Sequence, residues 1–249
     1  MPGVTKSRLR ELRDPDGQAQ AARLAAAIAA DLAAALASRP EASLVLSGGR
    51  TPAAMLARLA AQPLDWSRVA ITLADERWVA LEDAASNEAL VRAALGRGSA
   101  AAARFVALKN GAPTPAAGAA LAWRALQALP RPFDLVVLGM GDDGHTASLF
   151  PGSPELAAGL DPWAPPGCLA VHPPNAPYAR LSLNLAALLD SRRICVQLSG
   201  AQKWEVYQRA RAEGPVAAMP IRAILRQDTV PVDVYWCPAD GEPEQERVQ

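Results

Sequence analysis

Short apolar runs that favour strands alternate with helix-forming segments along almost the whole chain of 249 residues. This alternation predicts an α/β fold, with a mainly parallel sheet and helices on both faces. The run at 133–138 is the clearest buried strand, because its apolar positions continue without polar alternation. Apolar residues make up 51% of the chain and aromatic residues only 5%, so alanine and leucine supply much of the expected core. No linker divides the alternation, and we expect one domain over residues 1–249.

Periodicity, proline positions and capping residues place the individual elements. Helices are expected at 18–38, 52–61, 87–95, 115–129, 201–210 and, as a short turn, 221–225. Strands are expected at 43–46, 69–73, 104–108, 133–138, 168–172, 180–184, 194–198 and 232–236. Ser86 is a candidate N-cap for the helix that follows it. The charged start at 1–17 and the polar end at 238–249 are expected to be peripheral or frayed.

Charge and hydrophobicity argue against several classes of partner. Lys+Arg and Asp+Glu both number 25, so no basic excess favours nucleic acid or an anionic membrane. The first residues lack the apolar run of a secretory signal. The apolar stretch at 19–37 is rich in alanine and interrupted by Arg23 and Asp31, which predicts a packed helix and not a membrane span. The three cysteines, with no ligand-like spacing, indicate a reducing compartment and hence the cytoplasm.

A glycine-rich turn ending at Pro52 reads Ser-Gly-Gly-Arg-Thr-Pro and follows a predicted strand. In open parallel sheets, ligands bind beyond the carboxyl ends of the strands. Gly48 and Gly49 allow backbone N–H groups to approach an anion, and Arg50 adds positive charge. Thr51 is expected to cap the following helix. The turn therefore predicts phosphate or sugar binding, although an ordinary tight turn would use the same glycines.

Further charged residues follow other predicted strands. Arg77 could bind an anion or a carbonyl oxygen and Asp75 a sugar hydroxyl, the alternative being a solvated loop with a local ion pair. Arg180 opens a strand. Lys203 lies in the first turn of a helix, where it opposes the helix dipole at a cost of roughly a few tenths of a kcal/mol. A bound phosphate would compensate that cost, whereas a solvent-facing lysine is the structural alternative.

The richest segment runs from Gly139 to Pro151 and reads Gly-Met-Gly-Asp-Asp-Gly-His-Thr-Ala-Ser-Leu-Phe-Pro. It formally contains the G-x-G-x-x-G pattern of dinucleotide-binding proteins. That pattern needs a long helix and an acidic residue at a strand end about twenty positions later. Pro151 and Pro154 prevent such a helix, and Asp161 does not follow a strand. We therefore interpret the dinucleotide match as accidental.

His145 is the candidate proton-transfer residue of this segment. We expect it at a helix start, where the dipole disfavours imidazolium and keeps the ring neutral. A neutral imidazole can accept a proton from water as a general base. Three roles are open to Asp143: orienting a substrate hydroxyl, tuning His145, or shaping the turn. A structural histidine is the alternative.

Other hydrolytic mechanisms lack their usual motifs. His145 and His172 are separated by 26 residues, 146–171, and no paired cysteines lie near them, so metal-ligand spacing is absent. The G-x-S-x-G motif of serine hydrolases is also absent. The sequence therefore favours direct attack by water, with neither a metal nor a covalent intermediate.

Taken together, these motifs resemble those of the 6-phosphogluconolactonase family. The resemblance covers nearly the whole chain and is most specific at Gly139–Pro151. Its other elements follow in the family's order, namely the Ser-Gly-Gly-x-Thr-Pro turn, Asp75-Glu76-Arg77, the Arg180 strand, Gly200-x-x-Lys203 and the Pro220 segment. Two positions depart from the family pattern. Arg50 occupies a variable position, and Ile221-Arg222-Ala223 replaces the small residues expected there.

The resemblance implies a Rossmann-like sheet like that of glucosamine-6-phosphate isomerase/deaminase. It also implies hydrolysis of 6-phospho-D-glucono-1,5-lactone to 6-phosphogluconate in the oxidative pentose phosphate pathway, without metal or organic cofactor. His145 would be the general base. The candidate substrate or phosphate contacts are Gly48, Gly49, Arg50, Asp75, Arg77, Gly144, Arg180 and Lys203. The expected partner is the sugar-phosphate lactone, with no nucleic acid or membrane, and the expected state is a monomer or small homo-oligomer.

Two alternatives belong to other functional classes. The related isomerase/deaminase acts on glucosamine 6-phosphate, but its family has Asn-Glu-Pro where this chain has Leu149-Phe150-Pro151. Its reaction also needs a second proton-transfer group, which the sequence does not identify. A non-enzymatic sugar-phosphate sensor would need a DNA-reading module. The first forty residues offer only one helix and no basic recognition surface.

Overall fold

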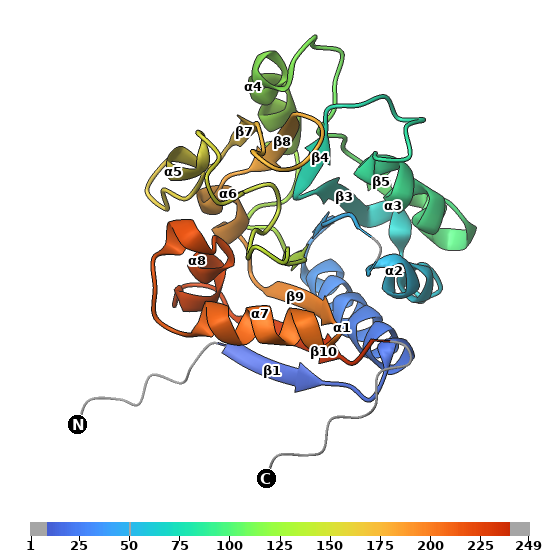
Figure 1. Cartoon of the computed structure of the whole chain (residues 1–249). Helices are drawn as coiled ribbons and strands as arrows, with labels where there is room; N and C mark the ends of the chain where they lie inside the picture. The colour runs from blue at the N-terminus through green and yellow to red at the C-terminus, as the bar shows by residue number, and fades with distance from the viewer. Residues whose placement is uncertain (1–8, 50, 240–249) are drawn as a thin grey trace, which may run out of the picture.

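The structure, a computed structural model, describes residues 9–49 and 51–239. Its central sheet has seven strands in the order β1-β10-β9-β6-β2-β3-β5, and all neighbouring pairs are parallel (Figure 1). The strands are β1 (Leu9–Arg13), β2 (Ala42–Leu46), β3 (Val69–Leu73), β5 (Arg104–Phe105), β6 (Leu135–Leu138), β9 (Ile194–Ser199) and β10 (Val232–Cys237). Every residue of β2, β3 and β6 is buried, as expected for strands covered on both faces.

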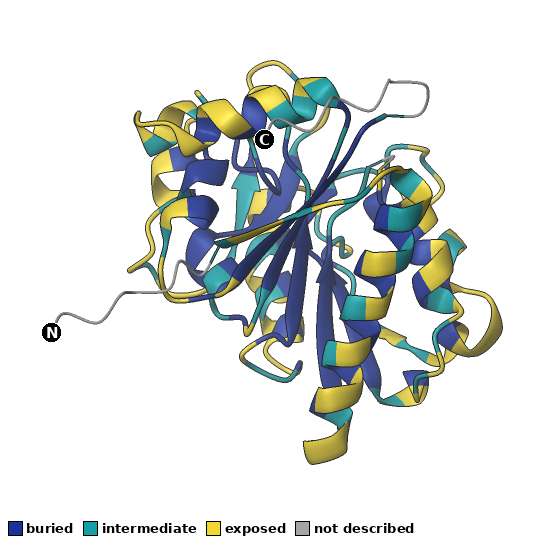
Figure 2. Cartoon of the chain, turned by 90° about the horizontal axis from the view of Figure 1, so that it is seen from below, coloured by how far each residue is buried: buried dark blue, intermediate teal, exposed yellow. Residues whose placement is uncertain are grey.

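Helices lie on both sides of this sheet, which confirms the predicted fold class (Figure 2). The α-helices are α1 (Gly17–Ser38), α2 (Ala53–Ala60), α3 (Asn87–Leu95), α4 (Pro115–Leu126), α5 (Leu156–Gly159), α6 (Leu185–Leu189), α7 (Ala201–Arg211) and α8 (Ile221–Arg226). Short 3-10 helices occupy Trp66–Arg68, Gly98–Ala102 and Val216–Ala218. Ser86 caps α3 by accepting a hydrogen bond from Ala89 N, as predicted.

Among the described residues, α1 alone is long and apolar enough to span a membrane by length and composition. One face of this helix, with Leu24, Ile28 and Leu32 fully buried, packs on β2, β6 and β10 and against α2. Burial of one apolar face is the arrangement expected of a core helix. The prediction of a packed helix at 19–37 is therefore confirmed.

A second, antiparallel sheet contains β4 (Asp75–Arg77), β8 (Arg180–Leu183) and β7 (Cys168–Val171), in the order β4-β8-β7. The strands of this small sheet were expected from the sequence only in part. The alternative of a solvated loop at Asp75–Arg77 is wrong, because pairing with β8 buries Asp75 and Glu76. The register places Asp75 opposite Ser182 and Arg77 opposite Arg180.

Several expected boundaries need correction. Residues 9–13 were expected to be peripheral or frayed, yet they form β1 and pair in parallel with β10. The helices α5 and α6 were not predicted, and Asn184, expected to end a strand, instead caps α6 by accepting from Ala187 N. The ranges 1–8 and 240–249, also expected to be peripheral, lie outside the described residues.

The strand order determines where a site can form. From β2 the chain adds β3 and β5 on one side, and then returns to add β6, β9 and β10 on the other. The direction of winding therefore reverses between β2 and β6. In open α/β sheets, ligands bind at such a reversal, beyond the carboxyl ends of the strands.

Candidate active site

A cavity of about 430 Å³ lies at the carboxyl ends of β2, β6 and β9, with β4 and β8 contributing to its wall. Of the predicted site residues, it is lined by Gly48, Gly49, Asp75, Arg77, His145, Arg180 and Lys203. Residues 48, 75, 145, 180 and 203 are far apart in the sequence, and the reversal of strand order brings them together. Asp143 and Gly144 adjoin the cavity without lining it, and Arg50 lies outside the described residues.

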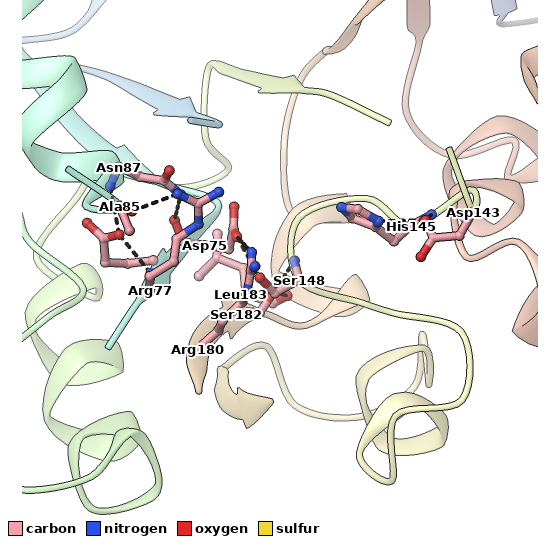
Figure 3. A network of polar contacts seen from close by, with 11 residues as sticks. Asp75, Arg77, Ala85, Asn87, Asp143, His145, Ser148, Arg180, Ser182 and Leu183 are labelled. Atoms are coloured by element: carbon pink, nitrogen blue, oxygen red, sulfur yellow. Dashed lines mark hydrogen bonds and ion pairs between the residues drawn. The ribbon is translucent and has the colours of Figure 1, made fainter. Parts of the chain in front are cut away.

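His145 and Asp143 form a carboxylate–imidazole pair (Figure 3). Nδ1 of His145 lies 2.6 Å from Oδ1 of Asp143, which also accepts the backbone N–H of His145 at 3.0 Å. An ionised carboxylate only accepts hydrogen bonds, so the proton of this contact belongs to Nδ1, and Nε2 is the other ring nitrogen. Burial acts to raise the pKa of Asp143, but the hydrogen bonds from His145 outweigh it and lower that pKa below its usual value.

The expectation that His145 starts a helix is wrong. Residues 139–151, all of them described, form turns and irregular structure without a helix, and α5 begins only at Leu156. Ala147 has a φ of +48°, in the left-handed region, and Leu149 N donates to Thr146 O at 3.0 Å to close a tight turn. The helix dipole therefore does not act on His145, and Asp143 is the group that orients its ring.

Two glycines make room for this arrangement. A Cβ at Gly141 would lie 2.0 Å from Nδ1 of His145, so only glycine lets the ring sit there. Gly144 has a φ of +79° and packs against Met219, and its carbonyl accepts the backbone N–H of Ile221 at the start of α8. Gly144 therefore shapes the histidine turn, and its predicted substrate contact stays a prediction.

Phe150 connects the imidazole to the cationic side of the site. Its ring centroid lies 4.1 Å from that of His145, and the Cζ of Arg180 lies 5.0 Å from the same ring. Phe150 is itself buried. The Phe150 ring therefore contacts both the imidazole and the guanidinium group.

Arg77 and Arg180 form a cationic pair on neighbouring strands of the small sheet (Figure 3). Arg77 Nη1 donates to Ala85 O at 2.6 Å, and Arg180 Nη1 lies 3.9 Å from Oδ2 of Asp75. Within the described part of the chain, the Nε atoms of both arginines are buried without a hydrogen-bond partner. Burial lowers the pKa of Arg180, although the Asp75 carboxylate acts to raise it. Both arginines also line the cavity, and two adjacent guanidinium charges favour binding of an anion there.

Lys203 lies in the first turn of α7, as predicted. Its Nζ forms an ion pair of 2.7 Å with Oδ1 of Asp142, in the loop that precedes His145. The cost of placing a lysine at a helix N-terminus is thus offset in part by a carboxylate. The lysine still lines the cavity and is about a quarter exposed, so an incoming anion can reach it.

Glu76 and Asn87 contribute to the site in ways that the sequence analysis missed. The buried Glu76 carboxylate accepts the backbone N–H groups of Arg77, Asn87 and Glu88, together with the Ser86 hydroxyl. It thereby caps α3 from a neighbouring strand. Asn87 lines the cavity, donates to Asp75 O at 2.9 Å, and fills the space beside Gly48. The predicted N-cap at Ser86 was the one signal that this helix start lies near the site.

The expected cap at Thr51 is wrong. The helix α2 begins at Ala53, and Pro52 precedes it with φ −75° and ψ −9°, without any side-chain capping bond. The Pro52 carbonyl accepts Leu56 N, the first i,i+4 hydrogen bond of the helix, which makes Pro52 the cap residue and places Thr51 one position too early to cap. The Gly48–Gly49 backbone nevertheless lines the cavity.

Within residues 9–49 and 51–239, no group of three or more His, Cys, Asp or Glu side chains is arranged to hold a metal ion.

Comparison with known proteins identifies the family of this chain. The chain matches the family of glucosamine-6-phosphate isomerases/6-phosphogluconolactonase over residues 15–236, and it belongs to that family. Within it, several curated relatives carry the name 6-phosphogluconolactonase. The protein of Pseudomonas putida is 47% identical over 223 residues, 90% of each chain. That of Rhizobium meliloti is 45% identical over 225 residues, 90% of this chain and 96% of the relative.

Solved structures agree with this placement. A 6-phosphogluconolactonase from Shewanella baltica superposes with a TM-score of 0.89 and 46% identity, covering 94% of this chain and all of the other. A monomeric glucosamine-6-phosphate deaminase superposes with a TM-score of 0.74 over 92% of this chain and 97% of the other. Its identity is only 17%, so that likeness shows the shared fold alone.

Proposed function

We propose that this chain hydrolyses 6-phospho-D-glucono-1,5-lactone to 6-phospho-D-gluconate, the lactonase step of the oxidative pentose phosphate pathway. One observation carries the proposal: a single cavity is lined by the His145 imidazole and by the cations of Arg77, Arg180 and Lys203. The family and the names of the relatives support the same activity.

In the proposed mechanism His145 is the general base. With Nδ1 hydrogen-bonded to Asp143, Nε2 accepts a proton from water, and the resulting hydroxide adds to the lactone carbonyl carbon. Collapse of the tetrahedral intermediate breaks the bond from that carbon to the ring oxygen. The imidazolium returns its proton to the departing alkoxide, which becomes a hydroxyl group. The reaction consumes one water and needs no electron transfer, so we propose that no organic cofactor takes part.

The phosphate supplies binding energy at a distance from the reacting carbonyl. Two of the three cations, Arg77 and Arg180, come from the small sheet, and Lys203 comes from α7. The guanidinium charges of Arg77 and Arg180 and the Gly48–Gly49 backbone, which line one cavity, support a phosphate site between them. We assign Asp75, which lines the same cavity, to a sugar hydroxyl.

Other parts of the proposal concern the whole protein. We propose that the chain acts as one lactonase domain, in the cytoplasm, as a monomer or small homo-oligomer. A balanced charge and an apolar helix that packs into the core support a protein without nucleic-acid or membrane partners.

The decisive experiment is an initial-rate assay with freshly generated 6-phosphogluconolactone, corrected for spontaneous ring opening. We expect rapid enzyme-dependent hydrolysis, and no ammonia release from glucosamine 6-phosphate under the same conditions. Ammonia release without lactone hydrolysis would instead assign the chain to the deaminase branch of its family. Unphosphorylated glucono-1,5-lactone serves as the control for the phosphate contribution.

A further inference from the structure

We propose that Ser148 is a positioning residue, which fastens the turn that carries His145 to the small sheet and fixes the Asp75 carboxylate. This inference rests on the proposed function for its kinetic test, but its structural test does not. Ser148 is fully buried and lies three residues after His145 (Figure 3). It was not a candidate in the sequence analysis.

Two hydrogen bonds of Ser148 cross from the histidine turn to the small sheet. Its backbone N–H donates to the Ser182 hydroxyl in β8 at 3.2 Å, and its own hydroxyl donates to Oδ2 of Asp75 in β4 at 2.5 Å. Ser182 is oriented in turn, because its hydroxyl donates to Leu183 O at 3.0 Å. Asp75 and Ser182 are register partners, so Ser148 contacts both strands at one level of the small sheet.

The backbone next to Ser148 has a strained conformation that these hydrogen bonds stabilise. Ala147 lines the cavity and has a φ of +48°, a conformation that costs about 1 kcal/mol or more for a residue with a Cβ. On the other side of this residue, the Thr146 hydroxyl donates to Gly139 O at 2.9 Å. Hydrogen bonds thus fix the residues on both sides of Ala147. Thr146 bonds to the segment that follows β6 of the central sheet, and Ser148 bonds to the small sheet.

The Ser148 hydroxyl also orients the Asp75 carboxylate. This carboxylate is 5% exposed, and the Ser148 hydroxyl is its only hydrogen-bond donor in the part of the chain that the structure describes. The nearest cation, Arg180, is more distant, at 3.9 Å. Ser148 therefore sets the direction of the one carboxylate of the small sheet that faces the cavity. It joins the proton-transfer side of the site to the substrate-binding side.

The kinetic test is a double-mutant cycle between Ser148→Ala and Asp75→Ala, which removes the acceptor of the Ser148 hydroxyl. If Ser148 acts through Asp75, Ser148→Ala should lower kcat/KM about tenfold in the wild-type background, the equivalent of one hydrogen bond to a charged group. In the Asp75→Ala background it should lower kcat/KM by less than about twofold. An equal loss in both backgrounds would overturn the proposal.

Ser43→Ala is the matched control for folding. Ser43 is also fully buried and also bridges two segments, since its hydroxyl donates to Pro130 O and accepts Asp134 N. It lies at the opposite end of the sheet, at the start of β2. We expect both serine variants to lower Tm, and only Ser148→Ala to lower kcat/KM. An equal kinetic loss in Ser43→Ala would mean that Ser148 contributes stability alone.

The structural test uses the two histidines of the chain, whose imidazole nitrogens are observable by NMR in ¹⁵N-labelled protein. We expect Ser148→Ala to shift the ring resonances of His145. The ring resonances of His172, which pairs separately with Glu155, should stay unchanged. Unchanged His145 resonances would overturn the proposal, whether or not the protein hydrolyses the lactone. Absence of lactone hydrolysis by the wild-type protein would instead count against the proposed function.

Discussion

The 2.6 Å contact between Nδ1 of His145 and Oδ1 of Asp143 joins two residues that are only two positions apart. The same carboxylate oxygen accepts the His145 backbone N–H, so one short turn fixes both the position and the tautomer of the ring. In the proposed mechanism, Nε2 of a ring held in this way accepts a proton from water. This arrangement defines the first two predictions.

Replacing His145 with alanine should abolish proton transfer and leave the binding groups in place. We expect kcat to fall by a factor of about 10² to 10⁴, with little change in KM. Initial rates of lactone hydrolysis, corrected for spontaneous opening, measure both constants. His172→Ala is the matched control, because His172 also pairs with a carboxylate, at 2.8 Å from Glu155, but does not line the cavity. Near-normal turnover in His145→Ala would remove the residue from the mechanism.

Replacing Asp143 with asparagine should lower kcat about 10- to 100-fold, because an amide can no longer hold Nδ1–H by charge. Asp161→Asn is the control for the loss of a carboxylate charge. Asp161 lies on an exposed loop, so this variant should leave kcat unchanged. A kcat equal to that of the wild type would show that Asp143 only shapes the turn.

The same variant should change how stability depends on pH. The pKa of Asp143 is lowered in the folded protein, so its stabilising contribution is present above the unfolded value, about 3.8, and is lost as pH falls further. The Tm difference between the wild type and Asp143→Asn should therefore shrink below about pH 4. Thermal unfolding across pH 3 to 7 measures this difference. A Tm difference that grows on acidification would contradict the assignment.

Arg180→Ala and Lys203→Ala should chiefly raise KM for the phosphorylated lactone, by roughly tenfold or more each, because each removes a charged contact. Hydrolysis of unphosphorylated glucono-1,5-lactone should change much less. Lys109→Ala is the control for loss of a lysine, since Lys109 stacks on Trp78 and does not line the cavity. Equal damage with both lactones would argue against a phosphate contact.

Glu76→Gln should destabilise the protein more than its conservative character suggests. The buried carboxylate accepts three backbone N–H groups, whereas an amide places an NH₂ group against some of these donors. We expect a loss of about 2 kcal/mol in the free energy of unfolding, measured by urea denaturation. Glu88→Gln, which breaks only the i,i+4 pair with Arg92, should cost about 0.5 kcal/mol or less. Similar losses in both variants would mean that the Glu76 cap contributes little.

Much of this architecture could be predicted from the sequence because burial leaves a local pattern. Continuous apolar runs identified β2, β3 and β6, and the residues that follow such strands were expected at one edge of a sheet. The small sheet was harder to predict, because its pairing joins residues about a hundred positions apart, as in Asp75 with Ser182. Strand β1 was missed since its charged pattern, Leu-Arg-Glu-Leu-Arg, resembles an exposed terminus.

The errors at the site have a common physical origin. The helix expected at His145 depended on local propensity, whereas tertiary hydrogen bonds hold Ala147 in a left-handed conformation that no helix contains. Similarly, Glu76 and Ser148 lie within sequence motifs that indicate neither residue's role. Their roles arise from partners in distant segments, and composition and spacing do not report such partners.

The reversal of winding between β2 and β6 also bears on how this protein can diverge. At this reversal, the connections that follow the two strands run to opposite faces of the sheet. The opening between these connections is therefore a property of the backbone topology and does not depend on particular side chains. Substituting the residues around that opening changes which ligands bind there, while the hydrophobic core beneath stays intact. New chemistry can therefore be acquired at this edge without a new fold.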